Sequence, residues 1–177
     1  MLLWAHNPEN SWPGLYLYDI NQGLKNGATL IVVDPRGTRF AKKADHWLRL
    51  RPGTDVALVL SFIHVIIENG LYDKPFVEKW CYGFDRLRDH VTQYPPEWAE
   101  KITGVGAKVV EALARDYATV KPAALLAGWA PGRSAFGEQY HRAASALSAM
   151  SGNIGAVGGY SAGGVGRVPM GFLKEVL

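Results

Sequence analysis

Cysteine is almost absent from this sequence: Cys81 is the single one among 177 residues. A lone cysteine excludes a disulfide within the chain. It also excludes a cysteine-ligated iron–sulfur cluster or structural zinc site, because each needs about four ligands. Long apolar runs are missing too, since the longest candidate, residues 56–67, falls short of the roughly 18 residues that a membrane span requires. The sequence therefore predicts neither a cysteine-ligated metal centre nor a membrane span.

The short motifs that carry catalysis are also lacking. The chain has no G-x-S-x-G, no H-E-x-x-H and no cluster of paired carboxylates. Cys81 stands among aromatic residues with no histidine nearby, which favours a buried structural thiol over a nucleophile. His64 falls on or beside the apolar face of an expected helix and is interpreted as a core or boundary residue. We therefore predict a chain that binds a ligand but supplies no catalytic residue.

Charge of one sign is not concentrated. The formal net charge is +3, from 19 Lys and Arg against 16 Asp and Glu, and the only local basic cluster is Arg36, Arg39, Lys42 and Lys43. A nucleic-acid-binding protein usually shows a denser basic stripe. The charge pattern thus argues against nucleic acid and favours a small molecule that bears phosphate.

Apolar runs alternate with helical patterns along the chain. Strands are expected at residues 1–5, 28–33, 46–50 and 123–127, and the β-branched run at 28–33 is typical of a strand buried on both faces. Helices are expected from Ser11, with Pro13 near the first turn, to Asn26, and over 55–70, 107–118 and 135–150; residues 36–44 are expected to form a loop, and 74–98 short helical pieces. This alternation predicts a doubly wound α/β domain over residues 1–150, with a mostly parallel sheet and helices on both faces.

A glycine-rich segment follows this domain. Eight of the 21 residues from Ser151 to Gly171 are glycine. Such a composition does not suit the interior of a helix or strand, but it permits close approach of the backbone to a ligand. A flexible linker is the alternative interpretation of residues 151–177.

Ligands of doubly wound sheets bind beyond the carboxyl ends of the strands. That rule places residues 6–10, 34–38, 51–55 and 128–133 at one edge. No G-x-G-x-x-G follows the first strand, which argues against a standard NAD site. Asp34 is suited to accept hydrogen bonds from a ribose or a guanine edge, and the helix start after Gly53 is suited to bind phosphate. The alternatives are a turn aspartate, ordinary helix capping at Thr54 and Asp55, and a plain turn at His6-Asn7-Pro8.

An ordered series of motifs covers nearly the whole chain. It comprises Trp4-Ala5-His6-Asn7-Pro8, Val33-Asp34-Pro35-Arg36-Gly37-Thr38, Ala44-Asp45, Arg51-Pro52-Gly53-Thr54-Asp55, Gly70-Leu71-Tyr72-Asp73, Tyr82-Gly83-Phe84, Ile102-Thr103-Gly104-Val105, Leu113-Ala114 and Gly152-Asn153-Ile154-Gly155 with Gly158-Gly159. Together these motifs resemble the molybdopterin-dependent oxidoreductases of the dimethyl sulfoxide reductase family. Residues 7–13 and 80–84 are most similar to the subgroup of acetylene hydratases and related catabolic reductases.

The resemblance implies a cofactor and the residues that contact it. Members bind molybdenum or tungsten through two molybdopterin guanine dinucleotides, and this chain would be the α/β domain that holds one of them. Asn7 and its neighbours would lie along the diphosphate, Asp34 and Arg36 would address the guanosine, and the start of the 55–70 helix would contact the nucleotide. Residues 128–133 would approach the pterin. The expected cofactor-binding residues are His6, Asn7, Pro8, Asp34, Pro35, Arg36, Thr38, Arg51, Gly53, Thr54, Asp55, Gly128 and Arg133.

The sequence also departs from the family pattern. Ala5 replaces a usual glycine, and Gly37 stands where many members carry a basic residue. The metal ligand and the iron–sulfur cysteines of such enzymes lie upstream of the region matched here, so the resemblance implies an internal piece of a longer enzyme that is inactive alone. Its partners would be the remaining domains, and apolar faces left uncovered would favour self-association. Two further hypotheses remain at this point, a small nucleotide-dependent oxidoreductase and a non-catalytic interaction domain of the same fold.

Overall fold

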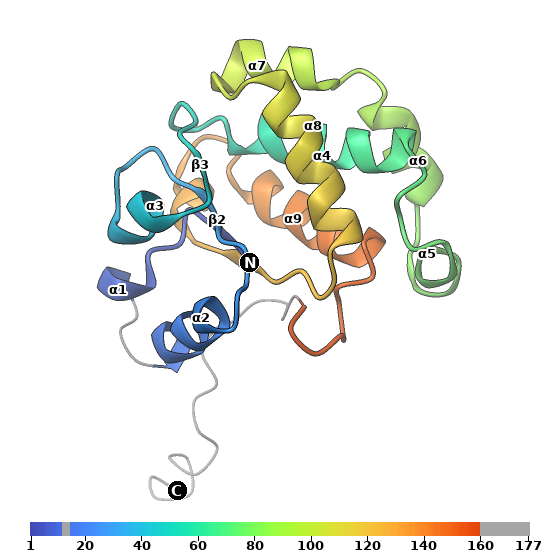
Figure 1. Ribbon diagram of the computed structural model, residues 1–177. Helices are drawn as coiled ribbons and strands as arrows, with labels where there is room; N and C mark the ends of the chain where they lie inside the picture. Colours follow the sequence, from blue (N-terminus) through green and yellow to red (C-terminus); the bar gives the residue numbers. More distant parts are fainter. Residues whose placement is uncertain (12–14, 160–177) are drawn as a thin grey trace, which may run out of the picture.

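A four-stranded parallel sheet forms the centre of the molecule (Figure 1). The computed structural model describes residues 1–11 and 15–159. The strands are β1 (Leu2–Trp4), β2 (Ile31–Val33), β3 (His46–Leu48) and β4 (Leu125–Ala127), arranged in the order β3-β2-β1-β4. All three pairings are parallel. The predicted α/β fold with a parallel sheet is confirmed.

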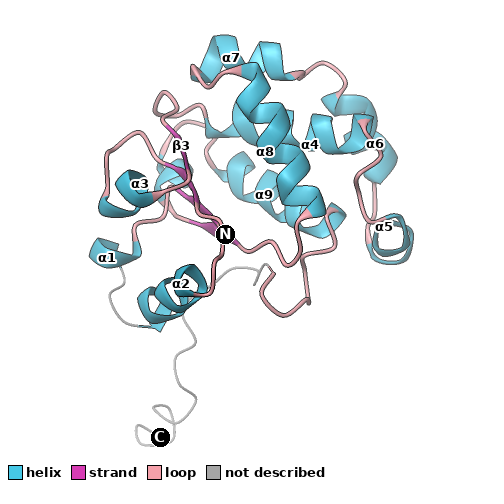
Figure 2. Cartoon of the chain, viewed as in Figure 1, coloured by secondary structure: helices cyan, strands magenta, loops and turns pink. Residues whose placement is uncertain are grey.

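Helices connect the strands and cover both faces of the sheet (Figure 2). They are α1 (Pro8–Ser11), α2 (Leu15–Lys25), α3 (Arg39–Lys43), α4 (Asp55–Glu68), α5 (Lys74–Trp80), α6 (Phe84–Val91), α7 (Pro96–Thr103), α8 (Ala107–Thr119) and α9 (Glu138–Met150), with a 3-10 turn η1 (Ala130–Arg133). Among the described residues, no helix is both long and apolar enough to cross a bilayer.

Alternate side chains of the strands feed two separate cores. Leu2, Trp4 and Val33 point into the larger core, which α4, α8 and α9 complete. Leu3 and Val32 point the other way, into a smaller core closed by residues of α2 and α3. Because both faces of β1 and β2 are buried, these two strands are apolar at every position.

Two segments differ from the sequence prediction. Residues 36–44, expected as a loop, contain the helix α3, which buries Phe40 and Ala41 against the smaller core. Residues 8–10, expected as part of a turn before a helix from Ser11, belong to the single-turn helix α1. Both helices are too short to show an apolar period, so tertiary burial decides their conformation. Pro13 lies outside the described residues.

The first half of the glycine-rich segment packs on the domain. A Cβ on Gly152 would overlap the Asp73 carboxylate, and a Cβ on Gly158 would lie 2.8 Å from Pro122. Lys121 Nζ donates to Asn153 Oδ1 over 3.1 Å. In residues 151–159 the close backbone approach is therefore to the chain itself, while the glycines from 163 onward lie outside the described residues.

Candidate functional site

The strand order reverses direction at β1. From this strand the chain moves outward through β2 to β3, and it later returns to place β4 on the other side of β1. A crevice opens beyond the carboxyl ends of the strands at such a reversal, and ligands of open α/β sheets bind there. The register pairs Trp4 with both Val33 and Ala127, so the residues that follow these three meet at one edge. Asn7, Asp34 and Gly128 all follow strands at this edge.

The tips of β1 and β4 are in direct contact. Gly128 N donates to Trp4 O over 2.7 Å, and a Cβ on Gly128 would overlap the carbonyl oxygen of Ala5. Ala5 itself has a φ of 48°, in the left-handed region that side chains disfavour. The usual glycine of the family at this position therefore has a conformational reason, and Ala5 adopts the same backbone at a cost.

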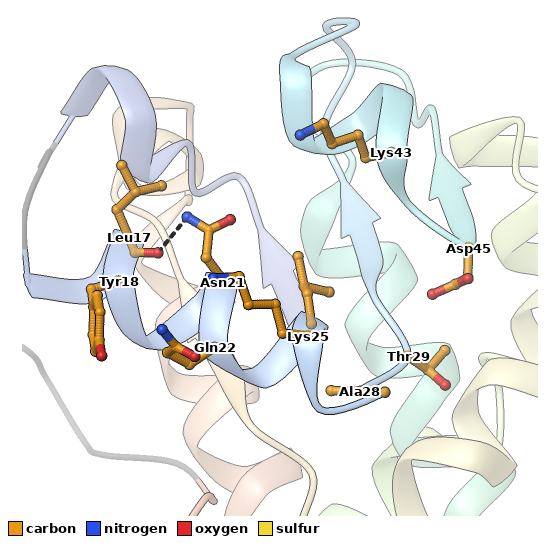
Figure 3. A pocket seen from close by; sticks show the side chains of 11 residues that line it. Leu17, Tyr18, Asn21, Gln22, Lys25, Ala28, Thr29, Lys43 and Asp45 are labelled. Atoms are coloured by element: carbon orange, nitrogen blue, oxygen red, sulfur yellow. Dashed lines mark hydrogen bonds between the residues drawn. The ribbon is translucent and has the colours of Figure 1, made fainter.

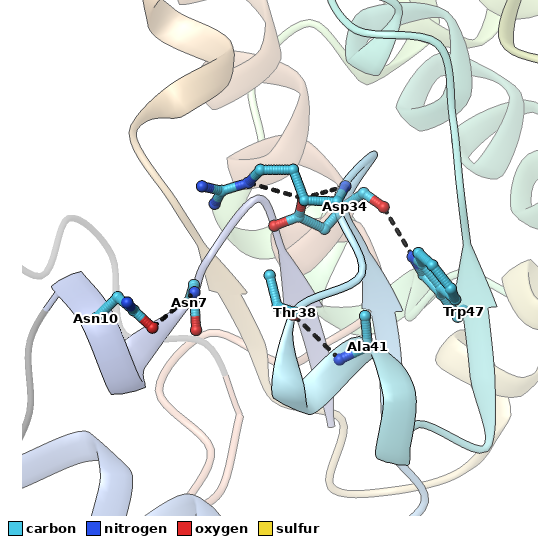
Figure 4. Close-up of polar contacts among 7 residues, drawn as sticks. Asn7, Asn10, Asp34, Thr38, Ala41 and Trp47 are labelled. Atoms are coloured by element: carbon cyan, nitrogen blue, oxygen red, sulfur yellow. Dashed lines mark hydrogen bonds and ion pairs between the residues drawn. The ribbon is translucent and has the colours of Figure 1, made fainter.

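Asp34 presents one carboxylate oxygen to the crevice. The residue is 3% exposed, and its Oδ1 accepts from the backbone N of Arg36 over 2.8 Å and from Arg36 Nε over 3.5 Å. No described residue donates to Oδ2. Trp47 Nε1 donates to the Asp34 carbonyl over 2.8 Å, as Figure 4 shows. The carboxylate is thus held in place with one oxygen left for a ligand's donor.

Asn7 carries an unpaired buried atom. Its Nδ2 donates to Asn10 Oδ1 over 3.2 Å (Figure 4), but its own buried Oδ1 has no partner among the described residues. Leaving such an atom unpaired costs about 1–3 kcal/mol. A ligand with a hydrogen-bond donor would remove that cost, so Asn7 fits a polar ligand at the tip of β1.

The amino terminus of α4 closes the crevice. Thr54 Oγ1 donates to Arg51 O over 2.6 Å and accepts no capping bond, so no side chain at the N-cap position pairs with the first amides of α4. Asp55 in the first turn is 8% exposed, and Trp4 Nε1 donates to its Oδ1 over 2.9 Å. Burial raises the pKa of Asp55 and outweighs the hydrogen bonds from Trp4 and from the residue's own backbone N–H, which lower it; the nearby charge of Asp34 adds to the rise. Two acidic side chains therefore share this edge.

The segment after β4 lies against the same helix start. Gly53 has a φ of 80°, and a Cβ placed on it would lie 4.0 Å from Ser134 Cβ, just beyond η1. Arg133 is exposed. The half-buried His6 lies after β1, and burial lowers its pKa, which favours the neutral imidazole near pH 7. The structure thus brings the four predicted segments to one edge.

Two further expected site residues, Arg51 and Thr38, also have structural partners. Arg51 Nη1 donates to the carbonyls of Lys101 and Ile102, over 2.8 and 2.9 Å, at the end of α7. Thr38 Oγ1 accepts from Ala41 N and caps α3. Their cofactor contacts stay a prediction. Away from this edge, burial raises the pKa of the Cys81 thiol, which disfavours the reactive thiolate.

The sequence analysis overlooked two tryptophans that orient the acidic residues. Trp4 reaches Asp55 across 51 residues and Trp47 reaches Asp34 across 13. A buried indole usually finds an acceptor for its N–H. A tryptophan within a predicted strand was therefore a usable signal for a nearby acceptor, although the sequence does not indicate which acceptor each one meets.

A separate groove lies at the opposite edge of the sheet (Figure 3). It measures about 980 Å³ and is lined by α2 and by residues that precede β2 and β3, among them Thr29, Lys43 and Asp45. Because it faces the amino ends of the strands, it lies away from the crevice. Within residues 1–11 and 15–159, no group of three or more His, Cys, Asp or Glu is placed to hold a metal ion.

Comparisons with known proteins agree on one family. A family model described as molybdopterin oxidoreductase matches residues 1–171. Acetylene hydratase of Syntrophotalea acetylenica is 49% identical over 107 residues, 60% of this chain and 15% of that protein. Dimethyl sulfoxide reductase DmsA of Escherichia coli is 35% identical over 197 residues, 98% of this chain and 24% of that protein.

A solved structure shares the fold. Acetylene hydratase from Pelobacter acetylenicus matches with a TM-score of 0.79 and 40% identity, over 85% of this chain and 21% of that one. The chain thus spans between 15% and 24% of the length of these relatives.

Proposed function

Because this chain belongs to the molybdopterin oxidoreductase family, we propose that it binds and orients one pterin dinucleotide, with a guanine nucleotide at the end held by the strand tips. Membership of the family confirms the resemblance predicted from the ordered motifs. The observation that carries the proposal is the convergence of Asn7, Asp34 and the start of α4 at the reversal of strand order. Each offers a group that is not fully paired within the described part of the chain.

The chemistry of these groups fits a nucleotide. The free Oδ2 of Asp34 accepts a hydrogen bond from a ribose hydroxyl or from a guanine N–H, and the exposed Arg36 lies beside it with a positive charge. The first amides of α4, together with the helix dipole, stabilise a phosphate. Gly53, with its positive φ, lets the backbone come close to that phosphate. Asn7 Oδ1 accepts from a donor along the ligand.

The role of this chain is positioning rather than catalysis. When bound, the cofactor supplies redox chemistry at a molybdenum or tungsten ion, and an iron–sulfur cluster would belong to other segments of the parent protein. The residues of this chain hold the nucleotide end, which fixes where the pterin end points. We propose that the remaining domains of a longer enzyme are its partners and that the chain alone is inactive. Exposed Trp129 and Phe136, which are 62% and 79% exposed, favour self-association of the isolated chain.

Calorimetric titration with nucleotides tests this proposal. The expected result is that GDP binds more tightly than ADP, NAD or FAD. Asp34→Asn is expected to weaken GDP binding at least tenfold, because the side-chain amide of asparagine replaces a charged acceptor by a neutral one. Preference for NAD or FAD would instead support a small nucleotide-dependent oxidoreductase. A folded chain that binds no nucleotide would support a non-catalytic interaction domain.

A further inference from the structure

Trp47 joins the edge strand β3 to the loop that carries Asp34. Its Nε1 donates to the Asp34 carbonyl over 2.8 Å, so the bond fixes the backbone of the residue whose side chain faces the crevice (Figure 4). Asp34 N in turn donates to Leu48 O over 3.3 Å. Two bonds from β3 thus hold one residue, one of them from a side chain.

The indole also packs against the far side of the same loop. A Cβ on Gly37 would lie 3.4 Å from Trp47 Cη2, so the ring lies beside the glycine. The guanidinium of Arg49 stacks at 5.8 Å from the ring centroid. The ring is 38% exposed, and its position is therefore set by these contacts rather than by burial in a core.

We propose that Trp47 is a positioning residue of the nucleotide site: it holds the loop 34–38 in the shape that presents Asp34 and Arg36 to the ligand. The inference rests on the proposed function and adds a residue that contacts no ligand itself. A loop held before binding loses less freedom when the ligand arrives, which strengthens affinity.

The test compares two exposed tryptophans in the 177-residue chain. Trp80 is 68% exposed and has Lys79 Nζ 5.0 Å from its ring, so Trp80→Phe is a matched control far from the crevice. Trp47→Phe keeps an aromatic ring and removes the N–H. Calorimetry measures the dissociation constants of GDP and of pyrophosphate for each variant. A second variant, in which the Trp47 indole is replaced by its sulfur isostere benzothiophene, removes the N–H alone.

The expected result is a split between the two ligands. Trp47→Phe and the isostere weaken GDP about fivefold, the usual effect of one lost hydrogen bond, and leave pyrophosphate unchanged, because the diphosphate is held by α4. Trp80→Phe changes neither. Equal binding of GDP by all variants would overturn the inference while leaving the proposed function intact. Equal weakening of GDP and pyrophosphate binding would also overturn the inference, since it would show that the substitution disturbs the whole site rather than the loop 34–38 alone. Failure of the unaltered chain to bind GDP would contradict the proposed function and this inference together.

Discussion

Substitution of Gly128 by alanine tests whether the tips of β1 and β4 touch. The added Cβ would overlap the Ala5 carbonyl, a backbone atom that no change of rotamer moves away. Overpacking of this kind costs about 1–3 kcal/mol. The shift also strains the 2.7 Å bond from Gly128 N to Trp4 O, whose loss costs about 1 kcal/mol. Together, Gly128→Ala lowers the free energy of unfolding by about 2–4 kcal/mol.

Urea unfolding followed by fluorescence measures this loss. Gly106→Ala is the matched control, because Gly106 has a φ of −59° and a Cβ there would come no closer than 4.0 Å to Glu100. It is expected to change stability by no more than about 0.5 kcal/mol. Equal stability of the two variants would refute the adjacency of β1 and β4, and with it the crevice between them.

Two further predictions concern the same edge. Ala5→Gly removes the strain of a side chain in the left-handed region, about 1–2 kcal/mol, and adds a backbone entropy cost of about 0.5–1 kcal/mol. The substitution is therefore expected to leave the free energy of unfolding unchanged or to raise it. Ala112→Gly is the control: Ala112 is an exposed residue in the middle of α8, and the substitution lowers the free energy of unfolding by about 1 kcal/mol. If urea unfolding showed equal losses for both variants, the positive φ of Ala5 would be contradicted. Asp55→Asn is expected to stabilise the fold at pH 7. The pKa of Asp55 is raised in the folded state, so stability is greatest below its unfolded pKa near 3.8 and falls as pH rises through the raised value. The gain in unfolding free energy from Asp55→Asn should therefore vanish toward pH 3. Asp116→Asn is the exposed control. A lower unfolding free energy for Asp55→Asn at pH 7 would refute the raised pKa.

The periodic segments were predictable because a buried face requires apolar residues at regular spacing in the sequence. The helix α4 shows its apolar face at three- and four-residue spacing, and the strand β2 shows a continuous β-branched run. Once these were placed, the rule for parallel sheets brought Asn7, Asp34 and Gly128 to one edge. The short helix α3 was missed because five residues with only Phe40 and Ala41 buried show no period.

The finer geometry of the site depends on contacts between distant residues. The bond from Trp4 to Asp55 and the bond from Trp47 to Asp34 follow from how the layers pack, which no local pattern encodes. The left-handed backbone of Ala5 is likewise set by the approach of β4. The sequence therefore predicts which segments meet, and the structure adds how each side chain is held.

The most direct test is a nitrogen-15 amide spectrum of the chain titrated with GDP. The account predicts that shifts concentrate in residues 5–7, 34–38, 53–55 and 128–133, at the carboxyl ends of the strands. Shifts confined to the groove at the opposite edge, around Thr29, Lys43 and Asp45, would contradict it.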